Sequence, residues 1–429
     1  MKFPLLPLAA LLLARASAFA APLDPLLAAE NLWAQKPSDF MAAAGRLGYE
    51  WTSSAHDSAR AARPDLTVFG QPAVESVARF EGDALKEITV TLYGRGDAGE
   101  LPEEKFDALV RDSAEAISKA TGVKFTVRGK DPTSAVKAEG LLWLTPRARY
   151  LLEYSKTKAV KARDIAFRAE FVRLEITGPE KKLGLLAGAT TSQRAKFAGA
   201  THVKKDATSG DVWIGDVPMV DQGQKGYCVV ASAERVMRYY GNPVDANELA
   251  QIANTKTDGG TSTDDMFLAL KKLGARLKVR VRDVQQGDTI KDLLKLIADY
   301  NRAAKKAGVP EVPDPGHMID VGAVYRAMKG DVLKEVRTKN KSDMTRFERQ
   351  IETHIDQGIP LLWTVMLGLT TERDIPQSAG GHMRLIIGYN KQKEEILFSD
   401  SWGAGHELKR LPLADGWTMT TGAMSIEPL

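Results

Sequence analysis

The pattern of apolar and polar positions predicts two helical segments in the first 180 residues. Residues 22–48 have a helical pattern, with Ser38 and Asp39 as the expected cap and Gly48 as the stop. Residues 102–120 form a predicted amphipathic helix, which has a proline in its first turn and a glycine just after its end.

Five runs with strand character accompany these helices. Apolar and polar residues alternate in several of them, as expected for strands with one buried face, and one pair flanks a Thr-Pro-Arg turn typical of a hairpin. The predicted strands are residues 73–80, 86–93, 141–144, 150–154 and 165–176. We therefore predict a separate N-terminal α+β domain with an antiparallel sheet over residues 21–178. Nothing in its sequence gathers acids, bases or ligands, so its role stays open.

Residues 179–211 differ from the rest of the chain, because four glycines are interspersed there with Ser, Thr, Lys and Ala. This composition predicts a linker. Residues 212–429 again contain alternating helical and strand patterns. Helices are expected over 229–240, 264–273, 290–307 and 343–357, and strands over 360–367, 382–389 and 395–398. The stretch 308–341, rich in Pro, Gly and charge, is predicted as a loop that lies either beside the site or on the surface.

The first 20 residues have the features of a secretory signal peptide. Lys2 provides a short positive start, residues 5–13 form an apolar core too short to span a bilayer, and residues 18–20 fit a small-x-small cleavage site. The mature chain is therefore expected to begin at Ala21, in the periplasm or outside the cell. No later apolar run reaches transmembrane length, so no stable membrane insertion is expected.

Charge and motif composition exclude several classes of function. The net charge is +4, and the 59 Lys and Arg residues are mixed with 55 Asp and Glu residues, which argues against a nucleic-acid-binding surface. The chain has no His-Glu-x-x-His motif and no second cysteine for a thiolate metal site. Phosphate-loop and dinucleotide fingerprints are also missing from the sequence, so no metal and no cofactor are expected.

Cys228 is the only cysteine of the chain, so it cannot form an internal disulfide in an exported protein. An unpaired thiol is open to oxidation there, and its presence favours a chemical role over that of an inert buried residue. The helix predicted over 229–240 ends at Gly241, which places the sulfur at a helix N-terminus where the dipole favours the thiolate. Gln222 lies six residues upstream on a Gly-containing turn, from which its side-chain amide can donate toward the sulfur.

A cysteine nucleophile needs a base and a group that orients the base. Of the six histidines, His382 stands out because it follows two glycines and opens a predicted strand. Asp400 follows the next predicted strand, and antiparallel strands at this spacing bring its carboxylate beside His382, where it can accept the ring N–H. Trp402 is expected to shield that hydrogen bond from water. His406 is a weaker reserve candidate, and the other four histidines are expected to be structural or surface residues.

These residues and their surroundings resemble the papain-like cysteine peptidase superfamily. The resemblance lies in a glutamine-glycine pair before the cysteine that heads a helix, in the histidine strand and in the motif that holds the orienting residue. The matching segments are Gln222-Gly223, Gly226-Tyr227-Cys228, His382 with Gly388-Tyr389, and Asp400-Ser401-Trp402-Gly403.

Within that superfamily the chain is most similar to the bacterial double-glycine-peptidase-like, or bacteriocin-processing-peptidase-like, branch. Aspartate replaces the usual asparagine at position 400, and Gly259-Gly260-Thr261-Ser262 leads into a predicted helix. The resemblance covers roughly residues 212–410. It implies a papain-like domain at 212–429, in which a helical subdomain led by Cys228 packs on an antiparallel sheet carrying His382 and Asp400.

The expected function is that of an exported cysteine peptidase with a Cys228–His382–Asp400 triad. The backbone N–H of Cys228 and the side chain of Gln222 are expected to hold the oxyanion. Two alternatives stay open: a transglutaminase-like acyl transferase, which shares the Cys, His, Asp order, and a peptide-binding protein with a vestigial site. The expected partner is a peptide or protein substrate, and the N-terminal domain is expected to contact either that substrate or the peptidase domain.

Overall fold

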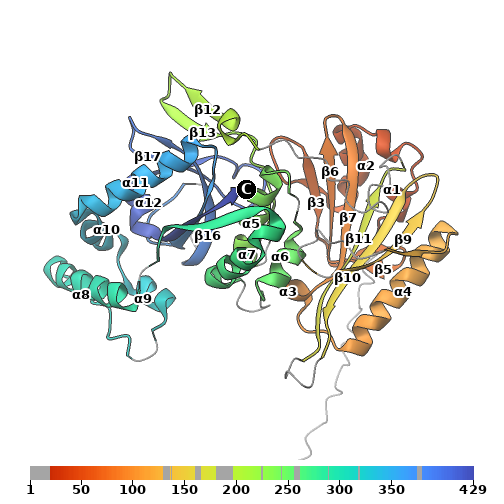
Figure 1. The fold of residues 1–429 in the computed structure, drawn as a ribbon, viewed down its shortest axis with the longest axis horizontal. Coiled ribbons are helices and arrows are strands. Elements are labelled where there is room, and N and C mark those ends of the chain that lie inside the picture. Colours follow the sequence, from red (N-terminus) through yellow and green to blue (C-terminus); the bar gives the residue numbers. More distant parts are fainter. Residues whose placement is uncertain are drawn as a thin grey trace, which may run out of the picture.

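The computed structural model contains two large β-sheets, with a group of helices between them (Figure 1). It describes residues 20–128, 136, 138–159, 166–179, 197–223, 226–242, 244–255, 261–287, 289–316, 319–373 and 379–429. The predicted signal peptide, apart from Ala20, lies outside the described residues. We call residues 20–179 the N-terminal region and residues 197–429 the C-terminal region.

The N-terminal region is built on an eight-stranded antiparallel sheet with the order β2-β3-β6-β7-β11-β10-β9-β8. Its strands are β2 (Glu50–Trp51), β3 (Ser58–Ala61), β6 (Glu75–Glu81), β7 (Ala84–Gly94), β8 (Thr126–Arg128), β9 (Glu139–Leu144), β10 (Arg149–Thr157) and β11 (Arg168–Thr177). A smaller sheet contains β1 (Ala21–Pro22), β4 (Leu66–Val68) and β5 (Gln71–Pro72). The five predicted strands of this region are all present.

The helices of the N-terminal region agree with the prediction in one case and differ in the other. Helix α4 (Glu103–Thr121) follows Pro102 and ends at Gly122, which adopts the left-handed conformation that favours glycine. Residues 22–48 do not form one helix: they contain the short segments α1 (Asp24–Leu27), η1 (Leu32–Ala34), α2 (Pro37–Ala44) and η2 (Gly45–Leu47). Proline disfavours helical backbone in the residue before it, so a new helix begins at Pro37, and no side chain caps it.

The C-terminal region contains a second large sheet, with the order β12-β13-β16-β15-β19-β14; β17 pairs with β16, and β18 pairs with β17. Its strands are β12 (Val203–Asp206), β13 (Asp211–Ile214), β14 (Val279–Gln285), β15 (Leu361–Leu367), β16 (Gly380–Asn390), β17 (Glu395–Ser399), β18 (Lys409–Pro412) and β19 (Thr420–Pro428). The first two strands differ from the prediction, because the expected linker over 179–211 contains β12 and the start of β13. Their pairing with each other and with β16 overrides the Gly-rich composition.

Helices surround this second sheet, and the first of them lies toward the N-terminal region (Figure 1). The helices are α5 (Cys228–Tyr239), α6 (Ala246–Ile252), α7 (Thr263–Leu277), α8 (Ile290–Ala307), α9 (Val321–Ala327), α10 (Gly330–Lys339), α11 (Lys341–Asp356) and α12 (Leu413–Met419). Two of them, α9 and α10, fall in the stretch 308–341 that was predicted as a loop. Each buries an apolar pair against the core, Val324–Tyr325 in α9 and Val332–Leu333 in α10, which outweighs the local charge.

Each region has an apolar cluster of its own, one around the N-terminal sheet and one between the C-terminal sheet and its helices. Among the residues that the structure describes, no helix combines the length and the apolar character needed to cross a membrane.

Candidate active site

Helix α5 begins at Cys228, as the sequence predicts. Val229, Val230, Ala233 and Val236 bury the helix against the C-terminal core, and the first turn contains no acidic residue. Cys228 is only partly buried, in contrast to most of the helix that follows it. This placement leaves the thiol accessible at the positive end of the helix dipole.

His382 and Asp400 lie in contact, each buried in the C-terminal region. Nε2 of His382 is 2.7 Å from Oδ1 of Asp400, and the two side chains are 6% and 0% exposed. The β16–β17 pairing accounts for this contact, because Leu385 lies opposite Ser399 and the chain reaches Asp400 one residue later. The hydrogen bond from Nε2 leaves Nδ1 as the ring nitrogen that can face the sulfur.

The electrostatics of His382 link it to both neighbours. Burial by itself lowers the pKa of the imidazole, but hydrogen bonds with Asp400 and Cys228, together with their charges, raise this pKa to about 9. Burial also opposes ionisation of Asp400, yet the hydrogen bond and charge of His382 and the charge of Arg384 hold the pKa of this carboxyl below its usual value. The arrangement therefore favours a protonated imidazole beside an ionised carboxylate at neutral pH.

Gln222 is tied to the loop that holds Asp400. Its backbone N–H donates to the carbonyl oxygen of Ser401 at 2.9 Å, and its Oε1 accepts from Oγ of Ser401 at 2.5 Å. Ser401 thus engages the oxygen of the side-chain amide and not its NH₂ group. The turn itself is closed by Asp221, whose Oδ1 accepts from the N–H of Gly223 at 2.8 Å.

Trp402 lies against His382, as the sequence suggests. The two rings stack with centroids 4.7 Å apart and planes 17° apart, so the indole covers one face of the imidazole. His406 does not contact Asp400 or His382 through its ring. Its ring instead meets the edge of Trp402, with centroids 5.7 Å apart, while its carbonyl oxygen accepts from the N–H of Asp400.

Arg384 is a residue of this site that the sequence analysis missed. Its side chain is completely buried, with Nε 2.8 Å from Oδ2 of Asp400 and Nη1 2.8 Å from Oε2 of Glu372. Arg384 therefore holds the second oxygen of Asp400, while His382 and the N–H of Ser401 hold the first. Strand alternation offered a signal, since residues 382 and 384 share one face of β16 and a charge interrupts an apolar strand.

Arg235 is the second residue that the sequence analysis missed. It lies two turns after Cys228 on α5, is 1% exposed, and donates to the carbonyl oxygens of Pro218 at 2.8 Å and Asp400 at 2.9 Å. It also contacts Oγ of Ser399. Burial lowers the pKa of this guanidinium to about 10. The side chain fastens the cysteine helix to the aspartate loop, and no local motif in the sequence indicates it.

The structure brings together a cysteine at a helix start, a buried imidazole and a buried carboxylate, on a framework of helices and a sheet. Residues 214–423 match the Peptidase_C39 like family. This match supports the predicted resemblance of the C-terminal region to the double-glycine-peptidase-like branch of the cysteine peptidases. None of the curated proteins matches the chain.

Two solved structures show weak similarity to the chain. One is the peptidase domain of Streptococcus ComA, a bifunctional ABC transporter involved in a quorum sensing pathway; it is 14% identical, with a TM-score of 0.25, over 50% of this chain and 100% of that one. The other is xylellain, a cysteine protease from Xylella fastidiosa, which is 10% identical, with a TM-score of 0.26, over 55% and 90% of the two chains. At these values neither structure adds to the family match.

Proposed function

We propose that the chain is an exported cysteine peptidase that hydrolyses peptide bonds with Cys228, His382, Asp400 and Gln222. One observation supports this most directly: His382 interacts with Cys228 on one side and donates to Asp400 at 2.7 Å on the other. This is the relation that a nucleophile, a base and an orienting group require. The family match of residues 214–423 supports the same class of reaction.

In the first half of the proposed reaction, Sγ of Cys228 attacks the carbonyl carbon of the scissile bond. The thiol proton resides on Nδ1 of His382, and Asp400 stabilises the imidazolium. The carbonyl oxygen becomes an oxyanion, which accepts hydrogen bonds from the backbone N–H of Cys228 and the side-chain amide of Gln222. The C–N bond then breaks, His382 gives its proton to the leaving amine, and a thioester remains.

In the second half, a water molecule attacks the thioester carbonyl and His382 takes a proton from this water. The same two donors hold the second oxyanion. The S–C bond breaks, the new carboxylate leaves, and Cys228 returns as a thiolate beside the imidazolium. Every step uses groups of the chain and one water, so the proposed reaction requires no cofactor.

The test is to incubate the purified chain from Ala21 onward, and its Cys228→Ala form, with a peptide library and to identify the products by mass spectrometry. We expect new termini with the unchanged chain only. Products that carry an added amine in place of water would instead identify an acyl transferase. Identical spectra for the two forms would contradict both enzymatic functions and favour the peptide-binding alternative.

Export is a separate part of the proposal and has its own test. The predicted mature chain begins at Ala21, the first residue of β1, whose N–H donates to the carbonyl oxygen of Asp65 at 2.8 Å. Cleavage after Ala20 therefore leaves every described strand and helix in place. N-terminal sequencing of the protein recovered outside the cytoplasm is expected to begin at Ala21. An intact Met1 there would contradict cleavage, and recovery from the cytoplasm alone would contradict export.

A further inference from the structure

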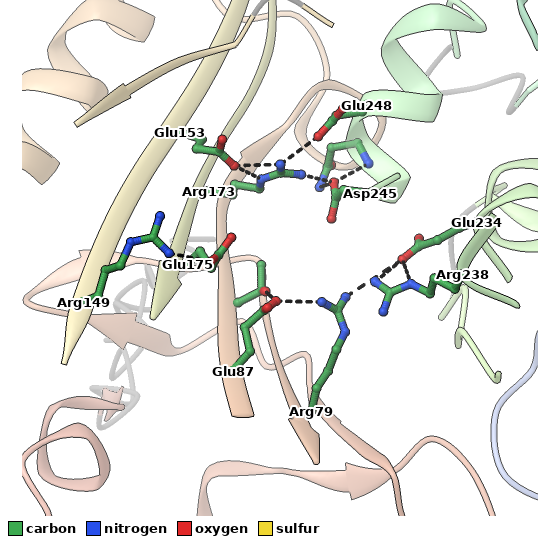
Figure 2. Close-up of polar contacts among 12 residues, drawn as sticks. Arg79, Glu87, Arg149, Glu153, Arg173, Glu175, Glu234, Arg238, Asp245 and Glu248 are labelled. Atoms are coloured by element: carbon green, nitrogen blue, oxygen red, sulfur yellow. Dashed lines mark hydrogen bonds and ion pairs between the residues drawn. The ribbon is translucent and has the colours of Figure 1, made fainter. Parts of the chain in front are cut away.

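The N-terminal sheet contacts the cysteine helix through charged side chains (Figure 2). Arg79 of β6 lies with Nη2 3.9 Å from Oε1 of Glu234 on α5, and Glu234 also accepts from Nε of Arg238 at 2.6 Å. Glu234 is 2% exposed, and burial raises the pKa of its carboxyl. Two partly buried cations from different regions thus meet one buried carboxylate on the helix that Cys228 begins.

A second group of charges connects the sheet to α6 (Figure 2). Arg173 of β11 lies 2.7 Å from Oδ1 of Asp245 and 2.8 Å from Oε1 of Glu248, and it also contacts Glu153 of β10 at 2.7 Å. Asp245 at the same time caps α6 by accepting the N–H of Asn247. We call Arg173, Glu153, Asp245 and Glu248 the interface cluster.

The N-terminal sheet also reaches the turn that carries Gln222. Arg60 of β3 donates to Glu75 at 2.8 Å and lies 3.7 Å from Oδ2 of Asp221, the residue that closes this turn. The guanidinium covers Gly223 so closely that a Cβ placed there would be 2.5 Å from Nη2. The turn that presents Gln222 is therefore packed against a side chain from the other region.

Two further contacts come from the N-terminal region to neighbouring parts of the site. The hydroxyl of Tyr227, the residue before Cys228, lies against Gly96 so closely that any side chain there would overlap it. The N–H of Ser54 donates to Glu407 at 2.5 Å, in the loop that follows Asp400. Three separate contacts thus end on the oxyanion turn, on the start of the cysteine helix and on the aspartate loop.

A cavity lies beside the oxyanion turn and explains why Arg60 matters to it. The cavity has a volume of about 250 Å³ and is lined from both regions, with Arg60, Glu75, Asp221, Gln222 and Tyr227 among its walls. On the cavity side of the turn, Arg60 contacts Asp221 and packs against Gly223. Removing the guanidinium would enlarge the cavity and remove these contacts from the turn.

We propose that the N-terminal sheet helps to position the active-site residues, and that Arg60 is the positioning residue for the side-chain amide of Gln222. The inference rests on the proposed peptidase function, in which Gln222 donates to the oxyanion. Arg60 does not touch the reacting atoms. It acts through Asp221 and Gly223, which fix the direction in which the neighbouring amide points.

The test compares kcat and KM of Arg60→Ala in the full-length mature chain with those of Gln222→Ala and of the double variant. We expect Arg60→Ala to lower kcat about 10- to 100-fold with little change in KM, because a small displacement of a donor has an effect of this size. In the Gln222→Ala background the same change is expected to cost less than about threefold, because the group that Arg60 positions is gone. Arg147→Ala, which removes an exposed arginine of the same region, serves as the control.

A second readout separates positioning from general damage to the site. Alkylation of Cys228 by iodoacetamide forms no oxyanion, so Arg60→Ala is expected to keep the wild-type alkylation rate while kcat falls. If Arg60→Ala does not fold, as judged by thermal melting, the same comparison of single and double variants is made with Arg60→Lys, because lysine keeps a cation beside Glu75. Three results would each overturn the inference. They are losses of kcat that add in the double variant, an unchanged kcat in Arg60→Ala, and a fall in the alkylation rate of Cys228 parallel to the fall in kcat.

A pair of glycine variants tests the contact at Tyr227 independently. Gly96→Ala is expected to displace the start of α5 and to slow both turnover and alkylation. Gly45→Ala is the matched control, since a Cβ at Gly45 meets nothing within 4 Å. Equal behaviour of the two variants would contradict a role for the N-terminal region. Failure of the proposed function itself would look different, because the wild-type chain and Cys228→Ala would then be equally inactive.

Discussion

Two clusters of charged residues, among those that the structure describes, look alike in composition and differ in their surroundings. The interface cluster joins one arginine to three carboxylates, and the site cluster joins Arg384, Asp400, Glu372 and His382. In the interface cluster the pKa of Asp245 is lowered and that of Glu248 is raised, and in the site cluster the pKa of Asp400 is lowered. Only the site cluster ends in a group that faces a nucleophile, because the imidazole of His382 also interacts with Cys228.

This difference shows what a perturbed pKa means in each place. In the interface cluster the charges satisfy one another and connect two sheets, so removing a member should affect stability. In the site cluster the proposed reaction moves a proton between His382 and Cys228, so removing a member should affect turnover. Buried charge alone therefore does not identify an active site. The feature that separates the site cluster is the contact of its imidazole with a thiol.

The largest expected effect follows from substituting Asp400. Asp400→Ala removes the acceptor of His382 and leaves Arg384 with Glu372 alone, and we expect kcat to fall on the order of 10³- to 10⁴-fold. Asp400→Asn keeps one carbonyl oxygen for the ring N–H and is expected to retain far more activity. Steady-state kinetics on the two variants decides this, and equal losses would show that the charge is essential or that another residue orients His382.

The next effect concerns the oxyanion. Gln222→Ala is expected to lower kcat on the order of 10²- to 10³-fold, roughly 3–4 kcal/mol, with KM nearly unchanged, because the donor acts in the transition state. Gln392→Ala, on the exposed turn between β16 and β17, is the matched control. A loss below about threefold, or an unfolded variant, would remove Gln222 from the site.

The pH dependence should report the site cluster directly. The pKa of His382 is raised from 6.5 to about 9, so the imidazolium survives through neutral pH and is lost as pH rises through about 9. Above that value kcat/KM is expected to fall about tenfold per pH unit, because the leaving amine no longer receives its proton. The stabilisation from this charge is likewise complete below pH 6.5 and disappears through about pH 9.

A variant of Asp400 sharpens that measurement. Asp400→Asn removes the charge that helps to raise the pKa of His382, so the alkaline limb of its pH profile is expected to move down from about 9 toward 6.5. If the alkaline limb of the pH profile stays near pH 9 in Asp400→Asn, a group other than His382 is responsible for that limb.

The smallest effect on turnover is expected at the interface cluster. Arg173→Met leaves Asp245 and Glu248 without this cation, and the free energy of unfolding is expected to fall by about 3–5 kcal/mol. In the fraction that stays folded, counted by iodoacetamide titration of Cys228, kcat should remain within about twofold of wild type. Arg147→Met at an exposed position is the control, and a large loss of kcat in Arg173→Met would erase the distinction between the two clusters.

Local sequence determined the elements that carry the chemistry. Cys228 begins a helix because a run of helix-forming residues follows it and Gly241 ends it. His382 and Asp400 meet because two short strands joined by a tight turn can pair in few registers. These features depend on residues within about 20 positions of one another, and the sequence alone was enough to predict them.

The tertiary structure decided everything that depends on charges far apart in the chain. Arg235 reaches the carbonyl of Asp400 across 165 residues, and Arg173 reaches Glu248 across 75. Arg60 lies against a turn more than 150 positions away. The pattern of apolar and polar residues does not predict such pairs, because a charged residue in a strand gives the same pattern whether it faces solvent or a charged partner. The same holds for β12 and β13, whose place in the second sheet comes from pairing with β16 and not from their own composition.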